Sequence, residues 1–245
     1  MLVDSHCHLD YPGLAEDEAG VVARARAAGV TVMQTIGTRL STFAATLAVA
    51  ERHDGVWCSV GVHPHEAGRE GIDSPVPLLR WADHPKVIGI GESGLDYFYD
   101  HAPRDRQAVS FRAHIDASRQ SGLPLIVHTR DADDDMAAIL EEEMVLGRFG
   151  GVVHCYSSSR MLAERATALG LCLGIGGILT FRRSDELRAT VKDMPPELLL
   201  LETDSPYLAP VPKRGRTNEP AYARFVAEVL GEVLALDLEG VARLT

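Results

Sequence analysis

A His-Cys-His triplet close to the start of the chain, at residues 6–8, has the residue types of a metal site. It ends a short apolar run of the kind that forms a buried strand. Side chains alternate between the two faces of a strand, so His6 and His8 should point to the same side. Cys7 should point to the other side and pack against a covering helix. We therefore expect the two histidines to bind one ion and the cysteine to take no part.

More residues of metal-binding type stand where later apolar runs end. They are His63, Glu92, His128, His154, Glu202 and Asp204. A lone histidine at the end of a strand is more often structural than a ligand. Histidines and carboxylates at the ends of most of the runs are hard to explain in that way, so the pattern predicts a metal site. Such ligands without cysteine favour Zn, Mn, Fe, Co or Ni, and also Mg where oxygen ligands dominate.

The number of candidate ligands exceeds what one tetrahedral ion needs. The six candidates are His6, His8, Glu92, His128, His154 and Asp204. Two divalent metal ions would use them all, with Glu92 as the bridge. Ions roughly 3.5 to 4 Å apart can generate a hydroxide near neutral pH and stabilise both oxygens of a phosphoryl displacement. Asp204 would then be both a ligand and the base that deprotonates the attacking water.

Three neighbouring polar residues have roles that the sequence leaves open. Glu202 is either catalytic or a group that holds a ligand histidine from outside the metal site. His65 follows His63 in a loop and either contacts substrate or caps a turn. The basic residues Lys213, Arg214 and Arg216 are either placed to meet a phosphate backbone or part of a solvated turn.

Eight short apolar runs recur along the chain, each followed by turn residues and then by a helix-compatible segment. They begin at Leu2, Val30, Val56, Val87, Leu123, Gly151, Leu171 and Leu198. Helical periodicity is clear over residues 104–121 and 217–235, and Asn218 before Pro220 is a helix-start signal. Strands alternating with helices predict parallel strands joined by helical crossovers. Eight units favour a single (β/α)8 TIM-type barrel over residues 1–245, with a doubly wound open sheet as the alternative.

The barrel explains why the candidate ligands are scattered along the sequence. The C-terminal ends of all its strands meet on one face, so residues that end different strands become neighbours there. The loop over residues 206–220 follows the last strand and should lie over this face.

The composition limits the classes of protein that this chain can be. It has 245 residues, a formal net charge of −11, no apolar stretch of the length of a membrane span and no signal-peptide pattern, so we expect a cytoplasmic protein. The four cysteines are far apart and form no CxxC pair, which is typical of buried reduced thiols. The charge argues against a protein that coats nucleic acid but allows an enzyme with a local basic rim. No obligate protein partner is evident.

Several longer stretches carry a resemblance to a known family. They are DSHCHLD, GVHPH, IGIGESGLDYFYD, QAVSFRAHIDASRQSGLPLIVHTRDA, GVVHCYSSS, LGIGGILTF and LLLETDSPYLAPVPKRGRTNEP, which follow one another over nearly the whole chain. In them the chain resembles the TatD-like metal-dependent deoxyribonucleases, a branch of the amidohydrolase-type barrels. Members of that family usually continue, past the point that VARLT reaches here, into a final Asn-containing helical segment.

The resemblance implies a set of roles for particular residues. By it, His6, His8, Glu92 and Asp204 would hold one metal, and Glu92, His128 and His154 the other, with His63 near the substrate. It also implies hydrolysis of DNA phosphodiester bonds with exonuclease-type activity. The alternatives are an ester or amide hydrolase acting on small molecules or D-aminoacyl-tRNA, and a catalytically idle barrel that serves as a scaffold. An intact ligand set weighs against the scaffold.

Overall fold

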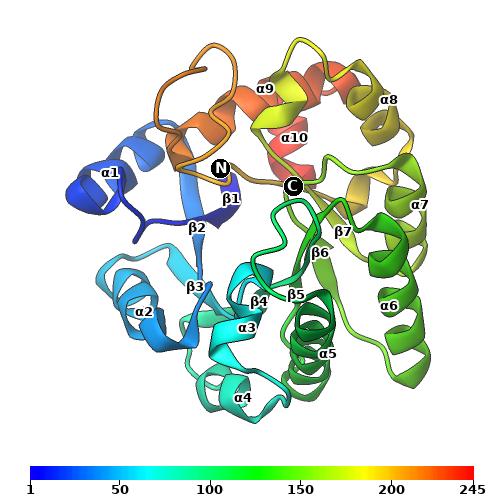
Figure 1. Ribbon diagram of the computed structural model, residues 1–245. Coiled ribbons are helices and arrows are strands. Elements are labelled where there is room, and N and C mark those ends of the chain that lie inside the picture. Colours follow the sequence, from blue (N-terminus) through cyan, green and yellow to red (C-terminus); the bar gives the residue numbers. More distant parts are fainter.

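The structure is a computed structural model that describes residues 1–245, and a ring of eight parallel strands forms its centre (Figure 1). The strands pair in sequence order: β1 Leu2–Cys7, β2 Val30–Ile36, β3 Val56–Val60, β4 Val87–Asp96, β5 Leu125–Arg130, β6 Gly151–Val153, β7 Cys172–Ile175 and β8 Leu199–Leu201. The ring is closed where the end of β1 meets the residues that follow β8. The Asp204 backbone N–H donates to the His6 carbonyl at 2.8 Å, and the His8 N–H donates to the Ser205 carbonyl at 2.8 Å. The predicted (β/α)8 barrel is confirmed.

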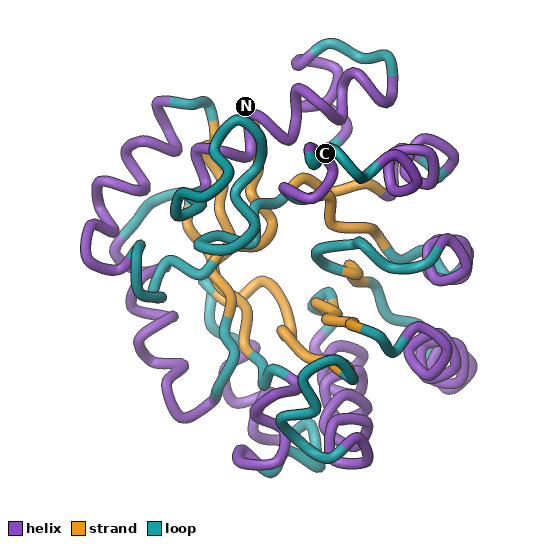
Figure 2. The backbone as a smooth tube through the Cα atoms, turned by 45° about the horizontal axis from the view of Figure 1, so that its top comes forward, coloured by secondary structure: helices purple, strands orange, loops and turns teal.

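Helices surround the strands on the outside (Figures 1 and 2). The α-helices are α1 Glu18–Ala27, α2 Phe43–Arg52, α3 Ala67–Glu70, α4 Val76–Ala82, α5 Arg104–Ser121, α6 Asp133–Leu146, α7 Arg160–Ala168, α8 Asp185–Asp193, α9 Ala223–Leu234 and α10 Leu238–Leu244. The 3-10 turns are η1 Ala15–Asp17, η2 Leu40–Thr42, η3 Pro64–Glu66, η4 Gly177–Thr180, η5 Pro196–Leu198 and η6 Pro220–Tyr222. The largest apolar cluster contains 51 buried residues drawn from strands and helices. No helix is both long enough and apolar enough to cross a membrane.

The two predicted helical segments have different outcomes. The segment 104–121 matches α5 from end to end. For the segment 217–235 the predicted start was wrong. The helix α9 begins only at Ala223, after the turn η6. Asn218 caps no helix: its side-chain amide donates to the carbonyls of Thr203 at 2.9 Å and Tyr207 at 2.6 Å. Its buried side chain therefore fastens the loop that follows β8 onto the barrel.

Candidate metal centre

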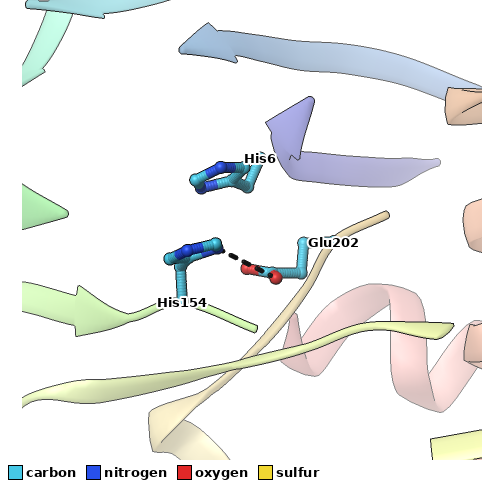
Figure 3. A group of neighbouring side chains, drawn as sticks. All are labelled: His6, His154 and Glu202. Atoms are coloured by element: carbon cyan, nitrogen blue, oxygen red, sulfur yellow. Dashed lines mark ion pairs between the residues drawn. The ribbon is translucent and has the colours of Figure 1, made fainter. Parts of the chain in front are cut away.

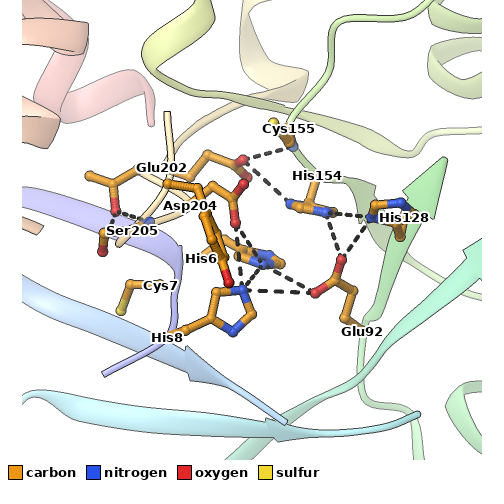
Figure 4. Close-up of polar contacts among 12 residues, drawn as sticks. His6, Cys7, His8, Glu92, His128, His154, Cys155, Glu202, Asp204 and Ser205 are labelled. Atoms are coloured by element: carbon orange, nitrogen blue, oxygen red, sulfur yellow. Dashed lines mark hydrogen bonds and ion pairs between the residues drawn. The ribbon is translucent and has the colours of Figure 1, made fainter. Parts of the chain in front are cut away.

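The first two histidines lie on one side of β1, as the alternation of strand side chains predicts. The Nε2 atoms of His6 and His8 are 3.3 Å apart, and both rings are buried. Cys7 points away from them into the apolar core, with its Sγ 3.3 Å from the Gln34 carbonyl oxygen (Figure 4). The Nε2 atoms face the Asp204 carboxylate at 3.7 and 3.5 Å. Two imidazoles and a carboxylate thus converge at the end of β1.

Glu92 lies between two sets of histidines (Figure 4). Its Oε1 is 2.9 Å from His128 Nδ1 and 2.9 Å from His154 Nε2. Its Oε2 is 3.5 Å from His6 Nε2 and 4.0 Å from His8 Nε2. Each oxygen of one buried carboxylate therefore faces a different pair of imidazoles, which is the arrangement of a bridging ligand.

The backbone of β4 brings Glu92 close to its neighbours. The strand does not end at Glu92 but continues to Asp96, so the carboxylate projects from within the strand. Gly94 pairs with His128 across β4 and β5 at a φ of +152°. A Cβ there would lie 1.9 Å from the His128 carbonyl oxygen, so only glycine permits this approach of the two strands.

Glu202 lies beside His154, next to the Nδ1 atom of its ring (Figure 3). It is fully buried, its Oε1 accepts a hydrogen bond from the Cys155 N–H at 2.7 Å, and the same oxygen is 3.6 Å from His154 Nδ1. A Cβ on Gly174 would lie 2.1 Å from its Oε2, so the missing side chain on β7 makes room for the carboxylate. His154 in turn stacks on His6, with ring centroids 3.8 Å apart. These contacts connect the two sets of histidines.

Burial and charge set the protonation of the buried site. Burial by itself would raise the pKa of Glu92, but His154, His63 and His128 around it hold that pKa well below its usual range. The Asp204 pKa is lowered in the same way, because His8 and its neighbours outweigh the effect of burial. Burial, with His154 nearby, lowers the pKa of His6. At His8, His128 and His154 the neighbouring carboxylates outweigh burial and raise the pKa. The carboxylates of the centre are therefore ionised, which is the form that binds metal ions.

This donor set fits divalent cations. Three groups of side chains could each hold an ion, because within each group the ligand atoms lie within 4.8 Å of one another. The groups are His6 with His8 and Glu92, His6 with His154 and Glu202, and His63 with Glu92 and His128. The buried Nε2 atoms of His6 and His8 face each other and two carboxylates across a gap suited to a cation. Nitrogen and oxygen donors without thiolate match the ions predicted from the sequence.

His63 and His65 lie at the edge of the centre. The Nε2 of His63 is 3.5 Å from Glu92 Oε1, and its Nδ1 accepts a hydrogen bond from the His65 N–H at 3.1 Å. The Nε2 of His65 is 2.9 Å from Asp96 Oδ2. The same Asp96 oxygen is 3.1 Å from His128 Nε2, so this carboxylate fixes the ring that turns its Nδ1 toward Glu92. Asp96 belongs to the stretch IGIGESGLDYFYD, but no pattern in the sequence predicts this role for it.

A cavity of about 830 Å³ opens beside the centre. His128, His154 and Asp204 line it, together with residues of the β5–α6 and β6–α7 loops. Arg214 does not line it: its guanidinium lies 4.0 Å from the Phe181 ring centroid and donates to the Ala209 carbonyl. The structure therefore places the predicted basic residue against the loops after β7 and β8, outside the cavity.

The barrel and the cluster at the C-terminal ends of its strands define a metal-dependent hydrolase of the TIM-barrel class. The family described as TatD related DNase matches residues 3–245, so the chain belongs to that family. It is 41% identical to the uncharacterized metal-dependent hydrolase YcfH of Escherichia coli (strain K12), over 100% of this chain and 92% of that protein. It is 33% identical to the 3'-5' ssDNA/RNA exonuclease TatD of Erwinia billingiae (strain Eb661), over 99% of this chain and 95% of that protein. The solved structure of YJJV, a TatD homologue from Escherichia coli K12, superposes with a TM-score of 0.91 at 32% identity and covers 99% of this chain and 94% of that one.

Proposed function

We propose that the protein is a nuclease that hydrolyses phosphodiester bonds of single-stranded DNA with two divalent ions. The observation that carries the proposal is the placement of Glu92, whose two carboxylate oxygens face two separate sets of histidines. One ion would be held by His6, His8, Glu92 and Asp204, and the other by Glu92, His128 and His154. The name of the Erwinia relative supports single-stranded nucleic acid as the substrate and exonuclease-type cleavage as the reaction.

The residues of the chain divide the chemistry among them. Bound divalent ions would lower the pKa of an attacking water and stabilise negative charge on phosphoryl oxygens. Asp204, whose side chain is 14% exposed, is open to the cavity and accepts the proton of that water. Its lowered pKa keeps it ionised. Glu202 faces the Nδ1 atom of His154, on the side of the ring away from Glu92, and orients that ring.

His63 supplies a hydrogen-bond donor at the edge of the site. Its Nδ1 accepts from the His65 N–H, so the ring proton resides on Nε2. Burial lowers its pKa well below the usual value, which keeps the ring neutral. A neutral ring with a proton on Nε2 can donate to a substrate oxygen without adding positive charge.

A second candidate is an ester hydrolase for cationic substrates such as an aminoacyl ester, including D-aminoacyl-tRNA. The acidic wall of the cavity favours it, because Asp131, Asp133, Asp134 and Asp135 all line the space beside the centre. Such a wall attracts an ammonium group and repels a polyanion.

A substrate panel tests the two candidates against each other. Protein loaded with Mn²⁺ or Mg²⁺, with occupancy confirmed by metal analysis, is assayed on labelled single-stranded DNA, on duplex DNA and on a D-aminoacyl ester. We expect cleavage of the single strand. Hydrolysis of the aminoacyl ester alone, at full metal occupancy, would replace the nuclease with the second candidate.

A further inference from the structure

Arg130 is the only lysine or arginine that lines the cavity beside the metal centre. It ends β5 two residues after His128, so the two side chains leave the same face of the strand. In a cavity that is otherwise lined by several aspartates, one guanidinium marks the place where an anionic group can be bound.

Two aromatic rings hold this guanidinium. Its central carbon lies 4.1 Å from the ring centroid of Phe98 and 4.9 Å from that of Tyr99. Arg130 forms no ion pair, and none of its side-chain N–H groups donates to a protein hydrogen bond. Aromatic faces attract the cation without neutralising it, so the edge of the guanidinium keeps its N–H donors for a ligand.

The aromatic residues are fixed to the metal centre through one buried carboxylate. Asp96 Oδ1 accepts hydrogen bonds from the backbone N–H groups of Phe98 at 3.1 Å and Tyr99 at 2.9 Å. Its Oδ2 is 3.1 Å from His128 Nε2. The two rings and a candidate metal ligand therefore share an anchor, which sets the position of Arg130 relative to the centre.

Phe98 also offers a free surface. Its side chain is 54% exposed, although large apolar groups are usually more covered. Tyr99 is stacked against His101, with the rings 10° from parallel, and is thereby stiffened. An exposed ring beside an unpaired guanidinium combines the two elements by which proteins bind single-stranded nucleic acid: a base-stacking face and a phosphate-binding cation.

We infer that Phe98, Tyr99 and Arg130 form a nucleotide-binding subsite, in which Arg130 binds a phosphate of the single strand and Phe98 stacks on the adjacent base. The inference deepens the proposed nuclease function and rests on it. Arg130 lines the same cavity as His128, so a phosphate bound by Arg130 would lie beside the metal centre.

Binding is measured first, separately from cleavage. The probe is a fluorescein-labelled octathymidylate with phosphorothioate linkages, which keep the charge and hydrolyse slowly, and the protein is loaded with Mn²⁺. Arg130→Gln should weaken binding, and the plot of log K against log salt should become shallower by about 0.7, the value for one lost phosphate contact on a single strand. Arg148→Gln is the matched control, because Arg148 is also exposed and unpaired but precedes β6, at the opposite end of the barrel.

The stacking contact is tested with a second pair of variants. Phe98→Ala should weaken binding by roughly 5- to 100-fold, and Phe98→Trp should restore it. On an oligonucleotide with abasic residues, Phe98→Ala and the wild type should bind equally, because no base is present to stack.

The outcomes separate the subsite from the nuclease function. Equal binding and salt dependence for Arg130→Gln and Arg148→Gln would overturn the subsite, as would an absence of binding by the wild type. Cleavage of ordinary single-stranded DNA is assayed in parallel. If binding depends on Arg130 but no cleavage occurs, the nuclease function is rejected and the subsite stands. If cleavage occurs but binding does not depend on Arg130, the subsite is rejected and the nuclease function stands.

Discussion

At the scale of single residues, Glu92 determines the character of the centre. Five imidazole rings, those of His6, His8, His63, His128 and His154, have a nitrogen within 4.0 Å of its carboxylate. A buried carboxylate in such surroundings stays ionised, as the lowered pKa of Glu92 shows. Its charge is thus available to cations throughout the neutral range.

Replacement of Asp204 tests the proposed base. Asp204→Asn keeps an oxygen that can face His6 and His8 but cannot accept a proton from water. We expect kcat on single-stranded DNA to fall by about 10²- to 10⁴-fold, while the metal content remains largely unchanged. Metal analysis and steady-state kinetics on the same preparation measure both. Turnover at the wild-type rate would remove Asp204 from the mechanism.

Sequence reasoning found the central side chains but not all their neighbours. The alternation rule that places His6 and His8 on one face also pairs Arg130 with His128, but an arginine is not a metal ligand and does not stand out in a search for ligands. The role of Asp96 depends on hydrogen bonds that join two strands and two loops, which no local pattern reveals. The position of Arg214 depends on its contact with Phe181, which comes from another loop.

At the scale of elements, α5 supports the loop that carries His63. His114 on this helix is fully buried, its Nε2 accepts from the Val62 N–H at 2.9 Å and its Nδ1 donates to the Ser110 carbonyl at 2.7 Å. The ring must be neutral to make both bonds, and burial lowers its pKa to about 4. A helix of the outer layer therefore holds the backbone next to the metal centre.

The stability of the protein should fall in acid partly through this histidine. Between the usual pKa of 6.5 and about 4, the unfolded chain binds a proton at His114 that the folded chain does not, so the free energy of unfolding decreases as the pH falls through that window. The loss is on the order of 3 kcal/mol. Urea unfolding of the chelator-treated wild type and of His114→Gln at pH 7 and pH 4.5 measures it. Equal pH dependence in the two proteins would contradict the expectation.

Element boundaries were predictable where packing follows local periodicity. The buried face of α5 packs on the barrel along its length, so its 3.6-residue pattern marks both ends. Before α9 the predicted helix start was wrong, because Asn218 and Pro220 are residue types that also occur where a helix begins. Tertiary hydrogen bonds to Thr203 and Tyr207 use the Asn218 side chain instead.

At the scale of the whole molecule, the candidate ligands come from β1, β4, β5 and from the residues that follow β6 and β8. The sequence predicted this gathering because eight strand–helix units favour a barrel, whose strand ends share one face. Only the folded barrel brings these side chains together, so metal binding and folding are coupled.

Metal binding should therefore raise the melting temperature. A free concentration of Mn²⁺ or Zn²⁺ at 100 times its Kd stabilises the folded state by about 2.7 kcal/mol, which corresponds to roughly 5 to 10 °C for a chain of this size. Calorimetry of chelator-treated protein before and after metal addition measures the shift. Glu92→Gln, which removes the bridging charge, should show a much smaller one. An unchanged melting temperature with both metals would count against a preformed centre.

The hydrogen bond from the Asp204 N–H to the His6 carbonyl has a consequence for biosynthesis. It ties a residue translated among the first to one translated after two hundred others. A nascent polypeptide on the ribosome cannot assemble the centre until residue 204 has emerged from the exit tunnel. Prematurely terminated fragments would thus be inert, and activity appears only once synthesis has passed the eighth strand.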